Sequence, residues 1–143
     1  QTVRFRLNSS APATLLSCAV MADPLTAYSD FGSPWTEWLA GGLVDFVCPM
    51  AYTTNRSRAL DLAAAATTEN APDVVYGIAV YNQPVDSALE AAARALALGA
   101  GGICVYSLNS LPPEGEAELA AFWGSGSPGH EFGPHLFHMV AAP

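Results

Sequence analysis

The sequence predicts an α/β protein with a parallel sheet, built from four strand–helix units. Four short apolar runs alternate with segments of helical character, and the runs begin near residues 14, 43, 74 and 102. A spacing of about 30 residues is that of one unit in a (β/α)₈ barrel, where about 250 residues form eight units. The four units account for residues 14–123. An open, doubly wound sheet uses the same kind of unit and stays an alternative, although no strand is followed by a G-x-G-x-x-G dinucleotide-binding turn.

The unit that begins at residue 43 has the clearest strand. Residues 43–51 form an apolar run that is rich in Val and turns polar after Tyr52. A run without alternation is typical of a strand that is covered on both faces. Pro49 cannot donate to a sheet ladder, so we expect a sheet edge or a local kink at this position.

The other elements follow from apolar runs and helix signals. Ser33-Pro34 and a capping box at Ser87–Glu90 predict two helix starts, and glycines predict the ends of these helices. Together with the strand at 43–50, the expected strands cover residues 14–21, 74–81 and 102–107. The expected helices cover residues 33–40, 57–67, 87–98 and 114–123.

The two ends of the chain have no periodic pattern. Residues 1–13 lack the features of a signal peptide and are left unassigned. Residues 124–143 are rich in Gly, Ser, Pro and His, which predicts a disordered tail. This tail contains His135-x-x-His138, but two ligands in a tail make a poor metal site. We expect no metal and no cofactor.

Charge and composition exclude several classes of partner. The net charge is −8, with five arginines and no lysine, whereas nucleic-acid binding needs a basic surface. No apolar run approaches the roughly 18 residues of a membrane helix, so no membrane insertion is expected. A neutral or cationic ligand fits this charge better. Cys18, Cys48 and Cys104 are too few and too far apart for a disulfide framework, and buried free thiols are expected.

Three of the four strands end in a tyrosine followed by a small polar residue. These pairs are Tyr52-Thr53, Tyr81-Asn82 and Tyr106-Ser107. Because the carboxyl ends of parallel strands in a barrel meet at one rim, the three tyrosines are expected around one mouth. Aromatic faces combined with hydroxyl and amide groups suit a sugar, so Tyr52, Tyr81, Asn82 and Tyr106 are candidate substrate-binding residues. The alternative is that tyrosine simply favours strands.

Acidic residues at the same rim are scarce. Asp23 directly follows the first strand and is the candidate catalytic or positioning acid. Asp45 lies at the opposite end of its strand and is expected to be structural. A glycosidase usually needs two carboxyl groups, so the catalytic set visible in this chain is incomplete.

Several strand sequences resemble one family of barrels. Val44–Thr53, Tyr76–Tyr81 and Gly101–Ser107 look like the last strands of the glycosyl hydrolase-like family 10 barrels, and the strand ending at Asp23 resembles their fifth strand. The segment Met50-Ala51-Tyr52 is also similar to the sixth strand of family 18 chitinase-like barrels. Those barrels carry an Asp where this chain has Thr53, and their D-x-x-D-x-D-x-E signature is absent here.

The resemblance implies that residues 14–123 are the C-terminal half of a (β/α)₈ TIM barrel, without the first four units and their acids. It also implies an O-glycosyl hydrolase that acts on a polysaccharide, is secreted or in the cell envelope, and is inactive as this fragment. The expected partners are an oligosaccharide or polysaccharide and either the missing half-barrel or a second copy. Two alternatives stay open: a non-catalytic carbohydrate-binding barrel domain, and a half-barrel that self-assembles without a sugar function.

Overall fold

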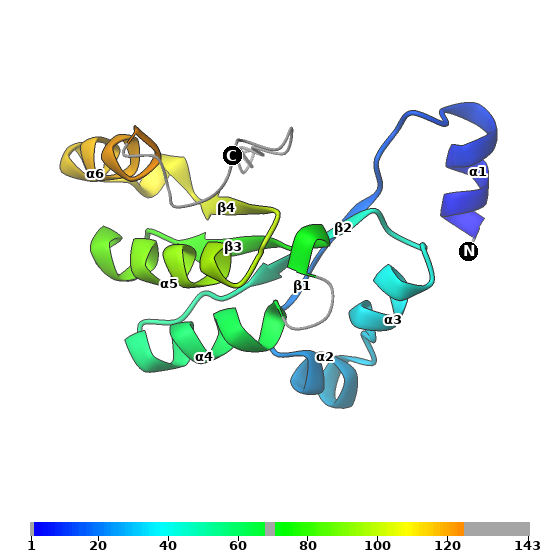
Figure 1. Cartoon of the computed structure of the whole chain (residues 1–143), viewed down its shortest axis with the longest axis horizontal. Coiled ribbons are helices and arrows are strands. Elements are labelled where there is room, and N and C mark those ends of the chain that lie inside the picture. Colours follow the sequence, from blue (N-terminus) through cyan, green and yellow to red (C-terminus); the bar gives the residue numbers. More distant parts are fainter. Residues whose placement is uncertain (1, 68–70, 125–143) are drawn as a thin grey trace.

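The computed structural model describes residues 2–67 and 71–124 (Figure 1). In this part of the chain, four strands form one parallel sheet in the order β1-β2-β3-β4. The predicted α/β class, the parallel direction and the sequential strand order are confirmed. The strands are β1 (Ser17–Met21), β2 (Phe46–Met50), β3 (Val75–Ala79) and β4 (Gly102–Tyr106).

Six α-helices and two short 3₁₀ helices accompany the sheet in the described residues. They are α1 (Thr2–Ser10), α2 (Pro24–Phe31), α3 (Trp35–Ala40), α4 (Arg56–Ala66), η1 (Ala71–Asp73), α5 (Val85–Ala97), η2 (Leu108–Ser110) and α6 (Pro113–Gly124). Helices α3, α4, α5 and α6 correspond to the four expected ones, whereas α1 and α2 were not expected. None of the described helices is both long and apolar enough to cross a membrane. The tail predicted over 124–143, with its histidines, lies almost entirely outside the described residues.

Helices α2 to α6 pack on one face of the sheet. The strands contribute buried side chains such as Val47, Tyr76 and Ile103 to this core, and the helices contribute Trp35 and Leu62 among others. The Tyr76 hydroxyl is buried there and donates to the carbonyl oxygen of Ala59 on α4 at 2.9 Å. Helices α4 and α5 lie side by side along the sheet (Figure 1). The main core therefore lies between the sheet and this layer of helices.

The opposite face of the sheet has a smaller cluster, made of Phe46, Cys48, Val75 and Cys104. Cys48 and Cys104 are buried, as expected, and the three cysteines form no disulfide bond in the described residues. Cys18 is only partly buried and packs against the helix-side core instead. The two faces thus differ: one is covered by five helices, and the other carries only a small cluster of buried side chains, two of them thiols.

Pro49 does not mark a sheet edge, so that alternative was wrong. β2 lies between β1 and β3, and it pairs with β1 along all five residues. Its pairing with β3 is reduced to Met50–Gly77 and an isolated bridge between Val47 and Val74. Because proline has no N–H, the ladder towards β3 lacks a hydrogen bond at this position. The sheet tolerates the proline inside a central strand by giving up pairing on one side.

The helix starts also differ in detail from the expected caps. α3 begins after Pro34 and α5 begins after Pro84, and neither start has a side-chain cap. Ser87 therefore lies inside the first turn of α5 and does not cap it. Proline sets a backbone conformation that is compatible with a helix start, so these helices begin without a polar cap.

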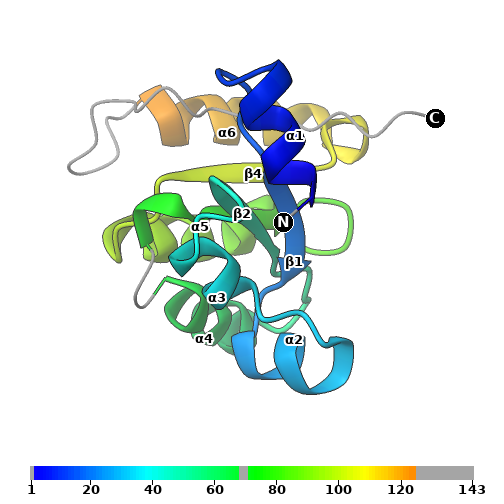
Figure 2. The ribbon, with the colours of Figure 1, turned by 90° about the vertical axis from the view of Figure 1, so that its right-hand side faces the viewer.

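Helix α1 is connected to the sheet through one ion pair. Arg4 donates to Asp45 Oδ2 at 2.7 Å, and the Leu16 amide donates to the same oxygen at 2.6 Å. Val3 and Phe5 on this helix are 60% and 72% exposed, and α1 lies apart from α4 and α5 in both views (Figures 1 and 2). Asp45 joins α1 to the amino end of the sheet, which confirms its structural role.

We expect Tyr76→Phe to lower the free energy of unfolding by about 1 kcal/mol, because it removes a buried hydrogen bond. Tyr28→Phe is the matched control, since Tyr28 is 64% exposed on α2. Urea unfolding of both variants measures the difference. Equal stabilities of the two variants would contradict the buried Tyr76–Ala59 contact.

Candidate functional site

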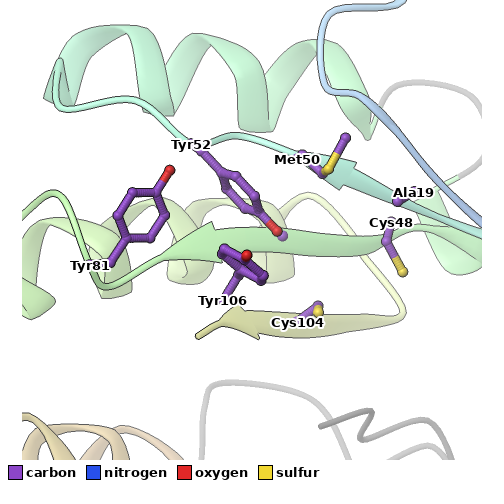
Figure 3. A pocket seen from close by; sticks show the side chains of 8 residues that line it. Ala19, Cys48, Met50, Tyr52, Tyr81, Cys104 and Tyr106 are labelled. Carbon is purple, nitrogen blue, oxygen red and sulfur yellow. The ribbon is translucent and has the colours of Figure 1, made fainter. Parts of the chain in front are cut away.

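Tyr52, Tyr81 and Tyr106 come together at the carboxyl ends of β2, β3 and β4, and we name them the tyrosine cluster (Figure 3). The rings of Tyr52 and Tyr106 are stacked, with centroids 5.3 Å apart and planes 15° apart. Tyr81 meets both rings edge-on at 85°, at 6.3 Å from Tyr52 and 5.8 Å from Tyr106. The three tyrosines expected at one rim are therefore in mutual contact.

A pocket of about 380 Å³ lies under the tyrosine cluster, on the sheet face that the helices leave uncovered (Figure 3). Besides the three tyrosines it is lined by Ala19, Cys48, Met50, Gly77 and Cys104. These side chains share a face because alternate residues of a strand point the same way. The register places Met50 opposite Gly77 and Gly77 opposite Cys104, which forms the floor.

Gly77 leaves room at the centre of this floor. A Cβ atom at this position would lie 2.9 Å from the carbonyl oxygen of Pro49, closer than packed atoms tolerate. The glycine thus allows β3 to approach β2 closely where Pro49 has weakened the ladder. It also leaves no side chain between Met50 and Cys104. Analysis of the sequence did not identify Gly77. The alternation of residues along a strand, which shows the positions that share a face, was the signal that could have identified it.

Burial changes the pKa of two polar groups that line the pocket. Burial raises the pKa of Tyr52 to about 12, with smaller contributions from Cys104 and Tyr106. Burial also raises the pKa of the Cys48 thiol to about 12. A thiol with such a pKa carries almost no nucleophilic thiolate. Cys48 is therefore not suited to act as a nucleophile in this pocket.

Asp23 lies outside the tyrosine pocket. Its Oδ1 accepts hydrogen bonds from the amides of Leu25 and Thr26 and caps α2, and its Oδ2 accepts from Arg58 Nη2 at 2.8 Å. The hydrogen bond from Arg58, helped by the two amides, lowers the pKa of Asp23 below its ordinary value. An ionised carboxylate with both oxygens engaged is suited to holding the loop after β1. The Asp23-Pro24 pair is a sequence pattern typical of a helix start, so the capping role of Asp23 could have been predicted.

Asn82 follows Tyr81 in the loop between β3 and α5 but is not among the residues that line the pocket. Its side-chain oxygen is buried and has no hydrogen-bond donor, and the same is true of Gln83 Oε1. Gln83 Nε2 donates to the carbonyl oxygen of Ala79 at 3.0 Å. The structure thus brings three of the predicted residues together, whereas Asp23 and Asn82 are not among the residues that line the pocket.

Groups for acid–base or metal chemistry are absent from the pocket as far as the chain is described. No carboxylate or histidine lines it, and residues 2–67 and 71–124 contain no group of three His, Cys, Asp or Glu side chains that could hold a metal ion. Comparison with protein-family models, with curated proteins and with solved structures gives no match for this chain. What the site does must therefore be argued from its geometry.

We expect Asp23→Asn to keep the helix cap and to remove the charge that pairs with Arg58. The side chains are 22% and 49% exposed, so the loss at neutral pH should be about 0.2–1 kcal/mol. A lowered folded-state pKa stabilises the fold above the unfolded-state pKa, and this contribution is lost as the pH falls through the folded-state value. The difference between wild type and Asp23→Asn should thus be fully present at neutral pH, begin to fall near pH 3.8 and be absent below the lower folded-state pKa.

Urea unfolding at neutral and at acidic pH measures this difference. Asp61→Asn is the control, because Asp61 is exposed on α4. A difference for Asp23→Asn that is the same at both pH values would show that the ion pair does not stabilise the loop.

Proposed function

We propose that this chain is the sugar-binding half of a (β/α)₈ barrel that acts on an oligosaccharide or polysaccharide. The observation that carries the proposal is the tyrosine cluster at the carboxyl ends of three adjacent parallel strands, above an uncharged pocket. Functional groups of (β/α)₈ barrels gather at this end of the strands. Aromatic rings offer a face to the C–H groups of a sugar, and the tyrosine hydroxyls offer hydrogen bonds.

Two features support the barrel over the doubly wound sheet. The strands follow one another in sequence order, without the reversal that creates the crevice of a doubly wound sheet. Helices α2 to α6 all contribute to the core on one face, whereas doubly wound sheets have helices on both faces. In a closed barrel, the face with Cys48, Val75 and Cys104 would be the interior.

Binding is better supported than catalysis by this chain alone. The pocket has aromatic walls, but no pair of carboxyl groups lines it, and glycoside hydrolysis usually requires such a pair. In a glycoside hydrolase of the kind that the strand sequences resemble, the acids would come from the other half of the barrel. Asp23 would then be a positioning residue, because its carboxylate is ionised and fully hydrogen-bonded. A non-catalytic carbohydrate-binding domain would use the same cluster.

A second copy of the chain is the partner we propose when the other half-barrel is absent. β1 and β4 are the outer strands of the described sheet, and open sheet edges favour association. Helix α2 lies beside β1 and carries three exposed apolar residues. The exposed fractions of Leu25, Tyr28 and Phe31 are 81%, 64% and 62%. Three large apolar side chains at a spacing of three lie on one side of a helix, and such patches mark contact surfaces.

We expect Tyr52→Ala to weaken oligosaccharide binding about tenfold. The ring of Tyr52 touches both other rings of the cluster. An aromatic face that packs on a ligand contributes about 0.5–1.5 kcal/mol, and about 1.4 kcal/mol corresponds to a factor of ten in affinity. Isothermal titration calorimetry with cellohexaose and chitohexaose measures the effect. Phe5→Ala is the control, because Phe5 is 72% exposed on α1 and lies outside the tyrosine cluster and the apolar side of α2. Unchanged affinity in Tyr52→Ala would place the binding site elsewhere.

The purified chain should self-associate in a concentration-dependent manner. Phe31→Glu puts a charge into the apolar side of α2 and should shift the equilibrium towards monomer. Asp61→Lys is the control, because Asp61 is an exposed position of α4. Sedimentation velocity at several concentrations decides the question. A wild-type chain that stays monomeric at the highest concentration contradicts the proposed contact.

A further inference from the structure

The three rings of the tyrosine cluster are not equivalent. Tyr52 and Tyr106 stack on each other, so each ring covers one face of the other. Both are only partly exposed. Tyr81 stands at 85° to both rings and is 50% exposed. Tyr81 is therefore the ring with the most surface available to a ligand, and the stacked pair fixes its position.

No cationic side chain among the described residues lines the pocket, so none is available there to bind an acidic sugar. The described residues that line the pocket carry no charge, and burial keeps the Tyr52 hydroxyl protonated by raising its pKa to about 12. The arginines at the start of α4 are already paired, Arg56 with Glu90 and Arg58 with Asp23. The chain as a whole has a net charge of −8. Anionic ligands would be repelled by the overall charge without a compensating contact.

We propose that Tyr81 is the stacking platform of the site and that it binds the flat C–H face of a neutral pyranose ring. This inference rests on the proposed sugar-binding function. The stacked Tyr52–Tyr106 pair supports the platform by holding the Tyr81 ring at a fixed angle before the ligand arrives. Pre-ordering of this kind reduces the entropy lost on binding. The preference for a neutral ring follows from the uncharged lining and the paired arginines.

The test separates the ring of Tyr81 from its hydroxyl. Tyr81→Leu removes the aromatic face, so affinity for cellohexaose or chitohexaose should fall by up to about tenfold, in line with the aromatic contribution. Tyr81→Phe keeps the face and should recover binding to within about threefold of wild type. Phe5→Leu is the matched control, since the Phe5 ring is 72% exposed on α1, outside the tyrosine cluster and the apolar side of α2. Proton NMR of the sugar adds an independent readout, since stacking shifts the C–H signals upfield, and Tyr81→Leu should abolish that shift.

The possible outcomes are distinguishable. If wild type binds neither neutral hexasaccharide, the proposed function fails. If wild type binds and Tyr81→Leu binds equally well with the same upfield shift, sugar binding stands and the platform assignment is overturned. Oligogalacturonate of the same length should bind at least about tenfold more weakly than the neutral sugars, consistent with the charge argument. Equal affinity for this acidic sugar would overturn the preference for a neutral ring.

Discussion

The register between β2, β3 and β4 is the constraint on which the site depends. Met50, Gly77 and Cys104 lie at one level across the three strands. Tyr52 and Tyr106 follow two residues after this level, and Tyr81 follows four residues after it, so all three project beyond the same floor. A slip of one residue would turn a strand's side chains to the other face. The tyrosine cluster therefore exists only because these strands keep this register.

The register is held although the central strand contains a proline. Pro49 removes a hydrogen bond between β2 and β3, and Gly77 lets the two strands approach closely at that point. The complete pairing of β2 with β1 and of β3 with β4 keeps both strands in place. On the other face, Tyr76 joins β3 to α4 through Ala59. The weak ladder and the open floor of the pocket are thus two consequences of the same close approach.

The strands and the tyrosine rim could be read from the sequence because they depend on local patterns. Apolar runs about 30 residues apart predict parallel strands, and parallel strands place their final residues at one edge. Helix α1 could not be predicted, since it has no apolar periodicity and is joined to the sheet by Arg4–Asp45, a contact across 41 positions. The role of Asp23 could not be decided from the sequence for a similar reason. A rim acid and a helix cap occupy the same place in sequence, and only the contact with Arg58, 35 positions away, distinguishes them.

The angles between the tyrosine rings could not be predicted from the sequence either, because they arise from packing across three strands.

Tyrosine-selective NMR of the chain during titration with a neutral hexasaccharide tests the proposed sugar site most directly. The chain has five tyrosines, two of which serve as internal references: Tyr28 on the surface of α2 and Tyr76 in the helix-side core. The ring signals of Tyr52, Tyr81 and Tyr106 should shift together with one dissociation constant, while Tyr28 and Tyr76 stay unchanged. Shifts at Tyr28 or Tyr76, or none in the tyrosine cluster, would contradict a sugar site at the carboxyl end of this sheet.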